Sequence, residues 1–401
     1  MALIWQRLKQ IGPALVLAAV VLGPGSITLS TIAGSLYQYR LLWVLCFATL
    51  FMITYTLMAA RIGLVTRQTL FDVARRKYGE RISKIGGLFG FMSILAFQAG
   101  NMAAVGFVGN ALIGYDSRVW SALFFLPAFG LFLLPNLYGK LELLVKIVIG
   151  LMIIGFVGTL VIVGIDFRAA TAGLVPSFPD RDSIFLALGM AATTFSIAAA
   201  AYQNHLMKEK NWGPEELTTE GLDSLLGIGV LGCVSIVVLL TSAGVIHGSG
   251  EKVFTAQTMA LQLEPLFGPA AFYLFISGFF FASFSSLVVN PFIGATLLVD
   301  GFGRNPAIDG RHVKIWATVV LAAGLGVVLM FKGSPIELLR IAQALAVIAF
   351  PVLGFLLWSI ARDREIMRES ANSTLMNVIA GLGYVTIVGI VLNYIRQIVG
   401  L

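Results

Sequence analysis

Small polar groups interrupt the apolar stretches of this 401-residue chain at places where they could together contact a small solute. Gly23-Pro24-Gly25-Ser26 lies at the centre of the first apolar stretch. Proline removes a backbone donor and glycine permits open backbone angles, so we expect the helix to unwind there. Ser196, with Thr193 and Thr194, adds hydroxyls at the centre of a later stretch. Together they predict a neutral, hydrogen-bonding site.

The composition identifies the solvent around these groups. Hydrophobic residues make up 58% of the chain and charged residues 12%, and the mean hydropathy is +0.92. A soluble domain carries roughly 25% charged residues, so the composition excludes a soluble enzyme, a disordered chain and a nucleic-acid module. Most of the surface must face lipid. The net charge of +7 then indicates basic cytoplasmic loops rather than nucleic-acid binding.

The apolar stretches predict an all-α polytopic membrane protein of about eleven transmembrane helices, because a span needs about 20 apolar residues. The predicted spans are 11–36, 40–65, 86–113, 118–136, 141–165, 183–207, 222–248, 269–299, 312–331, 335–361 and 374–397. A basic amphipathic helix is expected between Thr66 and Gly86, on the cytoplasmic surface. Lys and Arg concentrate on one side, which predicts a cytoplasmic N-terminus and an external C-terminus. A bacterial inner or plasma membrane is expected.

Many spans with short loops are typical of a transporter. Secondary transporters bind substrate where helices unwind near the midplane, at the interface of internal repeats. The break at Pro24 and the polar centre of the sixth span, around Ser196, therefore suggest two inverted five-helix repeats. The predicted division is 1–166 for helices 1–5, 167–361 for helices 6–10 and 362–401 for helix 11.

A family resemblance rests on motifs spread over nearly the whole chain. In order, they are Ile11-Gly12-Pro13-Ala14, Leu22-Gly23-Pro24-Gly25-Ser26, Ala33-Gly34-Ser35, Leu42-Trp43-Val44, Ala60 to Thr66, Lys77-Tyr78-Gly79, Gly173 to Pro179, Ser285-Ser286 and Gln343. With these motifs the chain resembles the NRAMP family of divalent metal transporters. The resemblance implies a LeuT-like fold, two inverted repeats and alternating access.

The family's metal-binding motifs are not matched residue by residue. Members that move manganese or iron carry Asp-Pro-Gly-Asn in the first span, where this chain has Gly23 and Ser26 at the Asp and Asn positions. Their Met-Pro-His in the sixth span aligns with Ser196, Ile197 and Ala198. A second histidine aligns with Gln203, and a two-residue shift would bring His205 there. Gln343 alone keeps its position.

Carboxylates are expected only outside the membrane interior. All Asp and Glu residues fall in predicted loops, as for Glu220 in 208–221, or at span ends, as for Asp223 and Asp300. The third span, which carries acidic proton-path residues in the family, is neutral here. Tight binding of Mn²⁺ or Fe²⁺ and proton coupling through carboxylates are therefore not expected. His205 falls near the cytoplasmic end of the sixth span, either as a packed or solvated side chain or as a proton relay or gate.

Two substrate hypotheses follow, and no enzymatic activity or cofactor is expected. The N-terminus of the second half of span 1 would favour a carboxylate-bearing or other small polar solute. Alternatively, hydrated Mg²⁺ or Mn²⁺ would be held by neutral oxygens. The predicted site residues are Gly23, Pro24, Gly25, Ser26, Ser196, Ala198 and Gln343, with Thr28, Gln98, Asn101, Tyr202 and Gln203 around them. A non-transporting scaffold is a third reading, and the oligomeric state is left open.

Overall fold

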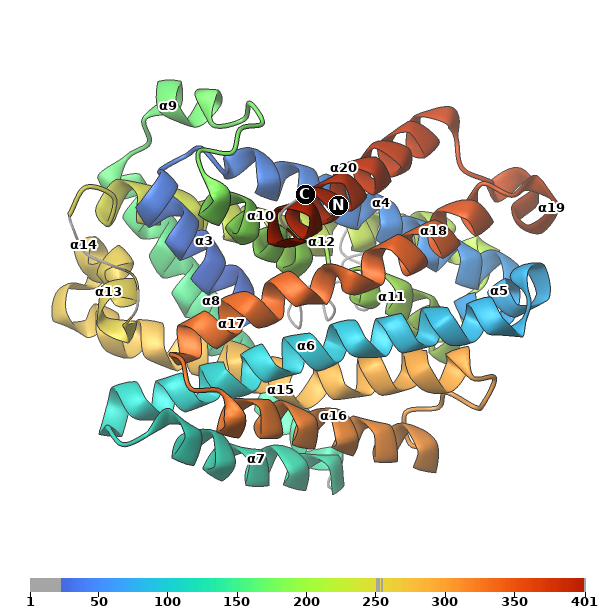
Figure 1. Cartoon of the computed structure of the whole chain (residues 1–401), viewed down its shortest axis with the longest axis horizontal. Helices are drawn as coiled ribbons and strands as arrows, with labels where there is room; N and C mark the ends of the chain where they lie inside the picture. The colour runs from blue at the N-terminus through green and yellow to red at the C-terminus, as the bar shows by residue number, and fades with distance from the viewer. Residues whose placement is uncertain (1–22, 134, 250–252, 254, 400–401) are drawn as a thin grey trace, which may run out of the picture.

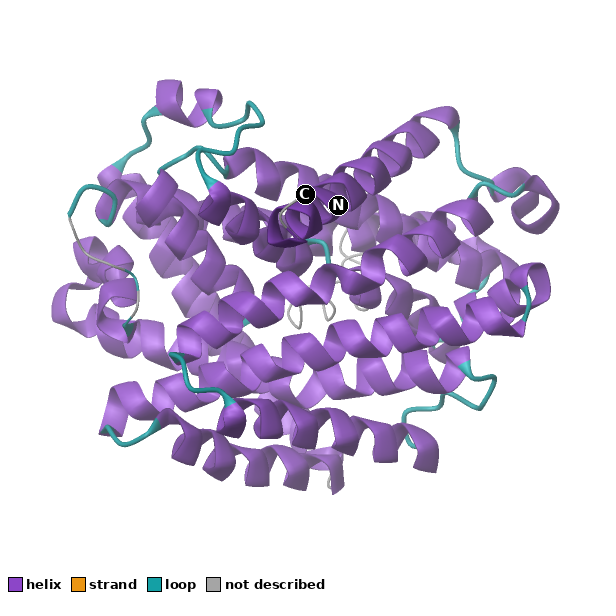
Figure 2. Cartoon of the chain, viewed as in Figure 1, coloured by secondary structure: helices purple, strands orange, loops and turns teal. Residues whose placement is uncertain are grey.

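The computed structural model describes residues 23–133, 135–249, 253 and 255–399. Over these ranges the chain forms helices and loops, with no strand (Figure 2). The first half of the predicted first span, residues 11–22, lies outside the described residues. An all-helical fold is what a lipid-facing chain requires, because a helix satisfies its own backbone hydrogen bonds.

The helices follow one another through short loops (Figure 1). The first half of the chain contains α3 (Pro24–Tyr37), α4 (Leu42–Thr66), α5 (Leu70–Tyr78), α6 (Glu80–Ile113), α7 (Ser117–Leu133), α8 (Pro135–Val163) and α9 (Phe167–Ala172). The second half contains α10 (Arg181–Thr194), α11 (Ile197–Glu209), η1 (Pro214–Glu216), α12 (Leu217–Val245), α13 (Ala256–Ala260), η2 (Leu261–Leu263), α14 (Glu264–Phe267), η3 (Gly268–Ala270), α15 (Ala271–Gly301), α16 (Arg311–Met330), α17 (Pro335–Leu345), η4 (Ala346–Ala349), α18 (Phe350–Ala361), α19 (Arg364–Met367), η5 (Arg368–Ser370) and α20 (Thr374–Val399).

Most of these helices are long enough to cross a membrane. Among the described residues, 8 helical segments are sufficiently long and apolar, and Ser117–Phe132 and Ile147–Val163 are shorter apolar helices. Every predicted span from 40–65 onward overlaps one of these segments, and α3 is the second part of the predicted span 11–36. The prediction of an all-α polytopic membrane protein is confirmed.

Close backbone approaches hold the bundle together around α6 and α15, which lie side by side along its length (Figure 1). A Cβ added to Gly87 of α6 would lie 2.9 Å from the Cα of Gly301 in α15. A Cβ on Gly34 of α3 would lie 2.3 Å from the carbonyl oxygen of Leu239 in α12. These contacts leave no room for a side chain, so glycine permits the packing that brings α3 and α6 to the centre of the bundle.

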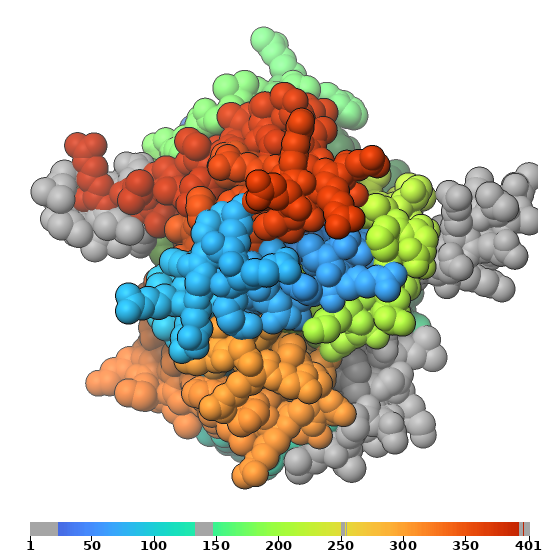
Figure 3. Space-filling model, turned by 90° about the vertical axis from the view of Figure 1, so that its right-hand side faces the viewer, coloured from blue at the N-terminus to red at the C-terminus, as the bar shows by residue number. Residues whose placement is uncertain are grey.

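The structure confirms only in part the amphipathic helix that was predicted between Thr66 and Gly86. It contains the short helix α5, whose Leu70, Phe71, Val73 and Ala74 are buried, and the first turns of α6. Thr69 caps α5, because its side chain accepts a hydrogen bond from the backbone N–H of Asp72. In Figure 3, the blue segment around α5 covers one end of the bundle, between the orange residues of α15 and α16 and the red C-terminal helices. We call this end the α5 end.

The prediction for Glu220 is wrong. It was expected in the loop 208–221, whereas it belongs to the first turn of α12 and is 1% exposed. Asp223 and Asp300 lie near helix ends as expected, but both are buried too, at 0% and 2% exposure. The hydrophobic pattern locates helices but does not reveal which neighbouring elements cover their ends. In this chain α11 and α5 bury carboxylates that hydropathy assigns to the surface.

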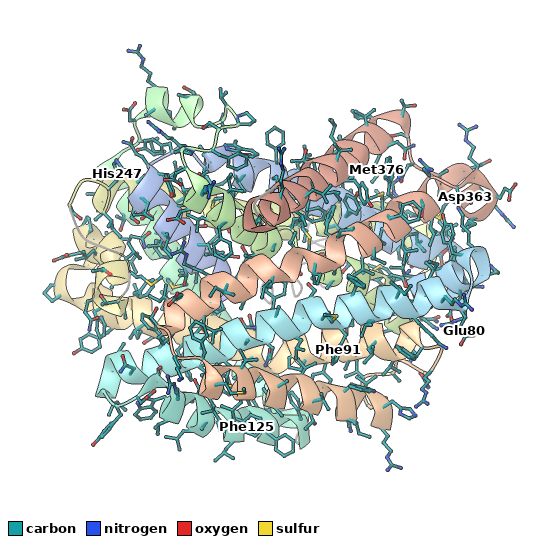
Figure 4. The ribbon with its side chains drawn as sticks, in the orientation of Figure 1. Glu80, Phe91, Phe125, His247, Asp363 and Met376 are labelled. Carbon is teal, nitrogen blue, oxygen red and sulfur yellow. The ribbon has the colours of Figure 1, made fainter. Side chains whose placement is uncertain are left out.

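One ion pair at the α5 end gives a prediction about stability. Lys77 donates a hydrogen bond to the carboxylate of Asp363, which holds the pKa of Asp363 below its usual value. Figure 4 shows Asp363 at the same end as Glu80. We expect Asp363→Asn to lower the free energy of unfolding by about 0.5–1 kcal/mol at neutral pH. Asparagine can still accept the hydrogen bonds that Asp363 accepts from the backbone N–H groups of Glu365 and Ile366.

The sign of the pH dependence follows from the lowered pKa of Asp363. The carboxylate contributes its stability above the pKa that it has in the unfolded chain, near 4, and loses it as the pH falls through the lower folded value. Thermal unfolding of the purified protein from pH 7 down to pH 3 should therefore show a difference between wild type and Asp363→Asn that shrinks at acid pH. A difference that is constant over this range would contradict the ion-pair explanation. Glu365→Gln, at an exposed position, is the control.

Candidate functional site

A cavity lies at the centre of the bundle, where α3 begins and where α10 gives way to α11. The residues that line it come from α3, α6, α10, α11, α15 and α17. They are Gly23, Gly25, Ser26, Ile94, Phe97, Asn101, Thr193, Ser196, Ala199, Ser286, Asn290 and Gln343. Helices far apart in the sequence therefore surround one small space.

The start of α3 forms one wall of the cavity. Gly23 has extended backbone angles, and Pro24 occupies the first helical position, where its missing N–H costs nothing. No side chain caps this helix. Gly25 packs so closely on α17 that an added Cβ would lie 2.6 Å from the side-chain Cδ of Gln343. The N-terminal end of α3 and its partial positive charge therefore border the cavity.

Another part of the wall is an interrupted helix. α10 ends at Thr194, Phe195 leaves the helical conformation, and α11 starts at Ile197. Ser196 has extended backbone angles and caps α11, with its hydroxyl accepting a hydrogen bond of 3.4 Å from the N–H of Ala199. The sequence predicted only a polar centre here, because no proline or glycine marks the break. A serine at the N-cap is the signal for a new helix start.

Several polar atoms around the cavity are buried and unpaired. The hydroxyl oxygen of Ser26, the side-chain carbonyl oxygen of Gln343 and the amide nitrogen of Asn101 have no hydrogen-bond partner in the part of the chain that the structure describes. These three side chains are 2–3% exposed. Buried polar groups are nearly always paired. The cavity therefore presents hydrogen-bonding capacity that a bound species could use.

The cavity is small and uncharged. The space open to the centre of a water-sized sphere is about 30 Å³, enough for about two water molecules. Its polar groups are hydroxyls and amides. The described residues contain no cluster of three or more His, Cys, Asp or Glu that could hold a metal ion. Any cation bound here would contact neutral oxygens.

A family model decides the identity of the chain. The model described as natural resistance-associated macrophage protein-like, Nramp, matches residues 14–397. The chain belongs to the Nramp family. It is thus an integral membrane transporter of the Nramp type, and the resemblance found in its motifs is confirmed.

Named relatives of this Nramp protein cover almost all of its length. The divalent metal cation transporter MntH of Acidiphilium cryptum is 24% identical over 97% of this chain and 90% of its own. MntH of Yersinia enterocolitica is 26% identical over 96% of this chain and 94% of its own.

Solved structures agree on the fold. A crystal structure of the Eremococcus coleocola manganese transporter matches with a TM-score of 0.80, at 17% identity, over 98% of this chain and 87% of that chain. The crystal structure of MhsT in complex with L-phenylalanine matches with a TM-score of 0.60, at 14% identity, over 94% of this chain and 98% of that one. At these identities the likeness concerns the fold alone.

The structure brings together many, but not all, of the residues singled out in this Nramp sequence. Gly23, Gly25, Ser26, Ser196 and Gln343 line the cavity, as does Asn101. Pro24 is buried at the start of α3. Ala198 is buried in α11, and Ala199 rather than Ala198 borders the cavity.

The remaining residues that were predicted to surround the site do not line the cavity. Thr28 is buried further along α3. The side-chain N–H of Gln98 donates to the carbonyl of Leu287 at 2.9 Å. Tyr202 and Gln203 lie further along α11 than the lining residues, and Gln203 donates to Glu220 at 3.3 Å. Gln98 and Gln203 thus form hydrogen bonds between helices.

Three polar lining residues, Thr193, Ser286 and Asn290, were not among the predicted site residues. Ser286 and Asn290 are four residues apart on α15 and so share one helix face. The helix α15 continues through Pro291, directly after Asn290. A period of four between polar residues in a mostly apolar helix is the signal that could have identified this face.

Proposed function

We propose that this Nramp protein transports a divalent metal ion that keeps part of its water shell, with Mg²⁺ preferred over Mn²⁺. The observation that carries the proposal is the central cavity, which is small, uncharged and lined by hydroxyl and amide groups. Hard cations take oxygen ligands, and Mg²⁺ keeps several waters because it dehydrates reluctantly. The family and the printed names of its relatives, divalent metal cation transporters, support the same substrate class.

The chemistry of the lining favours hard over soft ions. Sulfur and imidazole ligands favour transition metals, and none of the described residues that line the cavity carries either. A site without a carboxylate lacks the charge that would hold a divalent ion tightly. We therefore expect weak binding, with half-saturation in the millimolar rather than the micromolar range.

A small carboxylate is the second candidate substrate, and one observation favours it. The N-terminal ends of α3 and α11 both border the cavity, and α3 has no side-chain cap. Unpaired N–H groups at a helix start attract anions. The cavity's volume of about 30 Å³ limits this candidate to solutes no larger than a few heavy atoms in this conformation.

Uptake into proteoliposomes tests the two candidates directly. We expect saturable Mg²⁺ uptake above that of empty liposomes, and weaker uptake of Mn²⁺ at equal concentration. Saturable uptake of formate or acetate, without uptake of either metal, would replace the metal by the carboxylate. Half-saturation by Mn²⁺ at micromolar concentration would contradict the ligand argument, because neutral oxygens alone do not supply that affinity.

A further inference from the structure

A buried histidine–aspartate pair lies at the α5 end of the bundle, apart from the central cavity. His205 of α11 and Asp300, the penultimate residue of α15, are 3% and 2% exposed. The Nε2 atom of His205 lies 3.2 Å from Oδ2 of Asp300. The hydroxyl of Thr69, the residue that caps α5, donates to Oδ1 of Asp300 at 3.0 Å. The pair thus joins α11, α15 and the start of α5.

The hydrogen bonds of this pair are incomplete. Among the described residues, both ring nitrogens of His205 and the Oδ2 atom of Asp300 lack a hydrogen-bond partner, and the 3.2 Å contact between Nε2 and Oδ2 does not count as one. Leaving such groups unpaired in a protein interior is costly. A proton placed between Nε2 and Oδ2 would satisfy two of the three atoms at once.

Few charges face the pair. From α5, Arg75 donates to the backbone carbonyl of Asp300 at 2.7 Å and to the carboxylate of Asp72 at 3.0 Å. Lys208 of α11 and the carboxylate of Asp72 act on the pair only through their longer-range fields, with Lys208 favouring and Asp72 opposing a negative charge on Asp300. Neither cation makes a hydrogen bond with the carboxylate of Asp300. Without a proton, the pair therefore buries a negative charge that no contacting cation compensates.

The remaining neighbours contribute no further charge. From α6, Ser83 is buried and donates to the carbonyl of Gly301 at 2.9 Å. Of the charged residues of α6, Glu80 and Arg81 are exposed, and Lys84 is partly exposed and pairs with Glu80 at 2.8 Å. Arg61 is the charged residue of α4, and its electrostatic partner is Glu220. The helix α18 carries no charged residue.

We propose that His205 and Asp300 bind one proton between them, and that this proton holds the α5 end of the bundle closed. With the proton bound, the pair is neutral overall and joins α11 to α15 through an N–H···O bond. After its loss, neutral His205 can still donate its one ring N–H to Asp300, but the pair then carries a buried net negative charge. Water stabilises that charge only if α5 or α11 moves away. A proton that binds the closed form more tightly shifts the population toward that form.

The position of α11 connects this proton site to transport. Ser196 caps the start of α11 and borders the central cavity, and His205 lies near its other end. Eight residues of helix separate His205 from Ile197, a distance of about 12 Å at 1.5 Å per residue. The inference rests on the proposed function in one respect: the closed end is taken to lie on the substrate's path.

Backbone hydrogen exchange of the full-length protein in lipid nanodiscs tests the proton site without any substrate. We expect α5 and α11 to be protected at least tenfold more at pH 5.5 than at pH 7.5, after correction for the intrinsic exchange rate. In Asp300→Asn the buried charge is gone, so protection should be equal at the two pH values. The control Asp309→Asn makes the same change at an exposed position and should keep the wild-type dependence.

A second variant keeps the test decisive if Asp300→Asn does not fold. In His205→Gln the carboxylate must bind the proton alone, so the midpoint of the protection change should move by at least one pH unit. A wild type without pH-dependent protection overturns the proposal. So does an unchanged midpoint in either variant, because the pair would then be a purely structural contact. Since no ion is transported in this experiment, its result is independent of the outcome of the metal-uptake assay.

Discussion

Gly25→Ala is expected to reduce transport at least tenfold while leaving the protein folded. A Cβ at Gly25 would lie 2.6 Å from both Cδ and Nε2 of Gln343 and 2.8 Å from Cγ2 of Thr193, all within the distance at which atoms must shift. The methyl group would enter the edge of the cavity and displace the amide of Gln343 from it. Loss of space and of one oxygen ligand together should reduce substrate uptake at least tenfold.

Proteoliposome uptake and thermal unfolding, measured on the same preparations, check this expectation. Gly326→Ala is the matched control, since nothing lies within 4 Å of the Cβ that it adds to α16. It should transport like the wild type. Uptake by Gly25→Ala at the wild-type rate would mean that the substrate does not pass through the cavity at the start of α3.

Gly23→Asp should convert a weak metal site into a strong one. A Cβ at Gly23 would lie 3.1 Å from the hydroxyl oxygen of Ser286 and 3.9 Å from Oδ1 of Asn101, at the wall of the cavity. The space is tight, but a small rotation of the Ser286 side chain relieves it. The added carboxylate brings a negative charge to a site of neutral oxygens. We expect the half-saturating Mn²⁺ concentration to fall at least tenfold, which corresponds to about 1.4 kcal/mol.

The same substitution should make stability depend on metal. A buried carboxylate without a partner is costly, so Gly23→Asp should unfold at a lower temperature than the wild type in the presence of a chelator. Added Mn²⁺ should restore the unfolding temperature, because a ligand that binds only the folded state stabilises it. Gly23→Asn has nearly the same shape and no charge, and should gain neither Mn²⁺ affinity nor metal-dependent stability.

Adding Ser26→Asn to Gly23→Asp extends the test to both first-span positions that differ from the family's motif. If the double variant transports Mn²⁺ where the wild type does not, the scaffold is competent for metal and the wild-type cavity has a different preference. Unchanged Mn²⁺ uptake in both variants would contradict the assignment of the cavity as the metal's path.

The sequence determined the membrane class, the helices and the family. Runs of about 20 apolar residues must become helices in lipid, because no water is present to satisfy the backbone. That physical constraint is local, and the spans from 40–65 onward could therefore be read directly from hydropathy. The motif Gly23-Pro24-Gly25-Ser26 marked the start of α3 for an equally local reason, the backbone limits of proline and glycine.

Only the tertiary structure decided what surrounds these elements. Ser286 and Asn290 reach the cavity because α15 packs along α6, a contact between residues far apart in the chain. Asp300 and Glu220 are buried because α5, α11 and α12 meet over the helix ends, although each residue by itself reads as a surface carboxylate. Whether a residue is buried depends on the elements that pack around it. Hydropathy along one chain segment carries no information about those elements. The pairing of His205 with Asp300, 95 positions apart, is therefore a result of the fold alone.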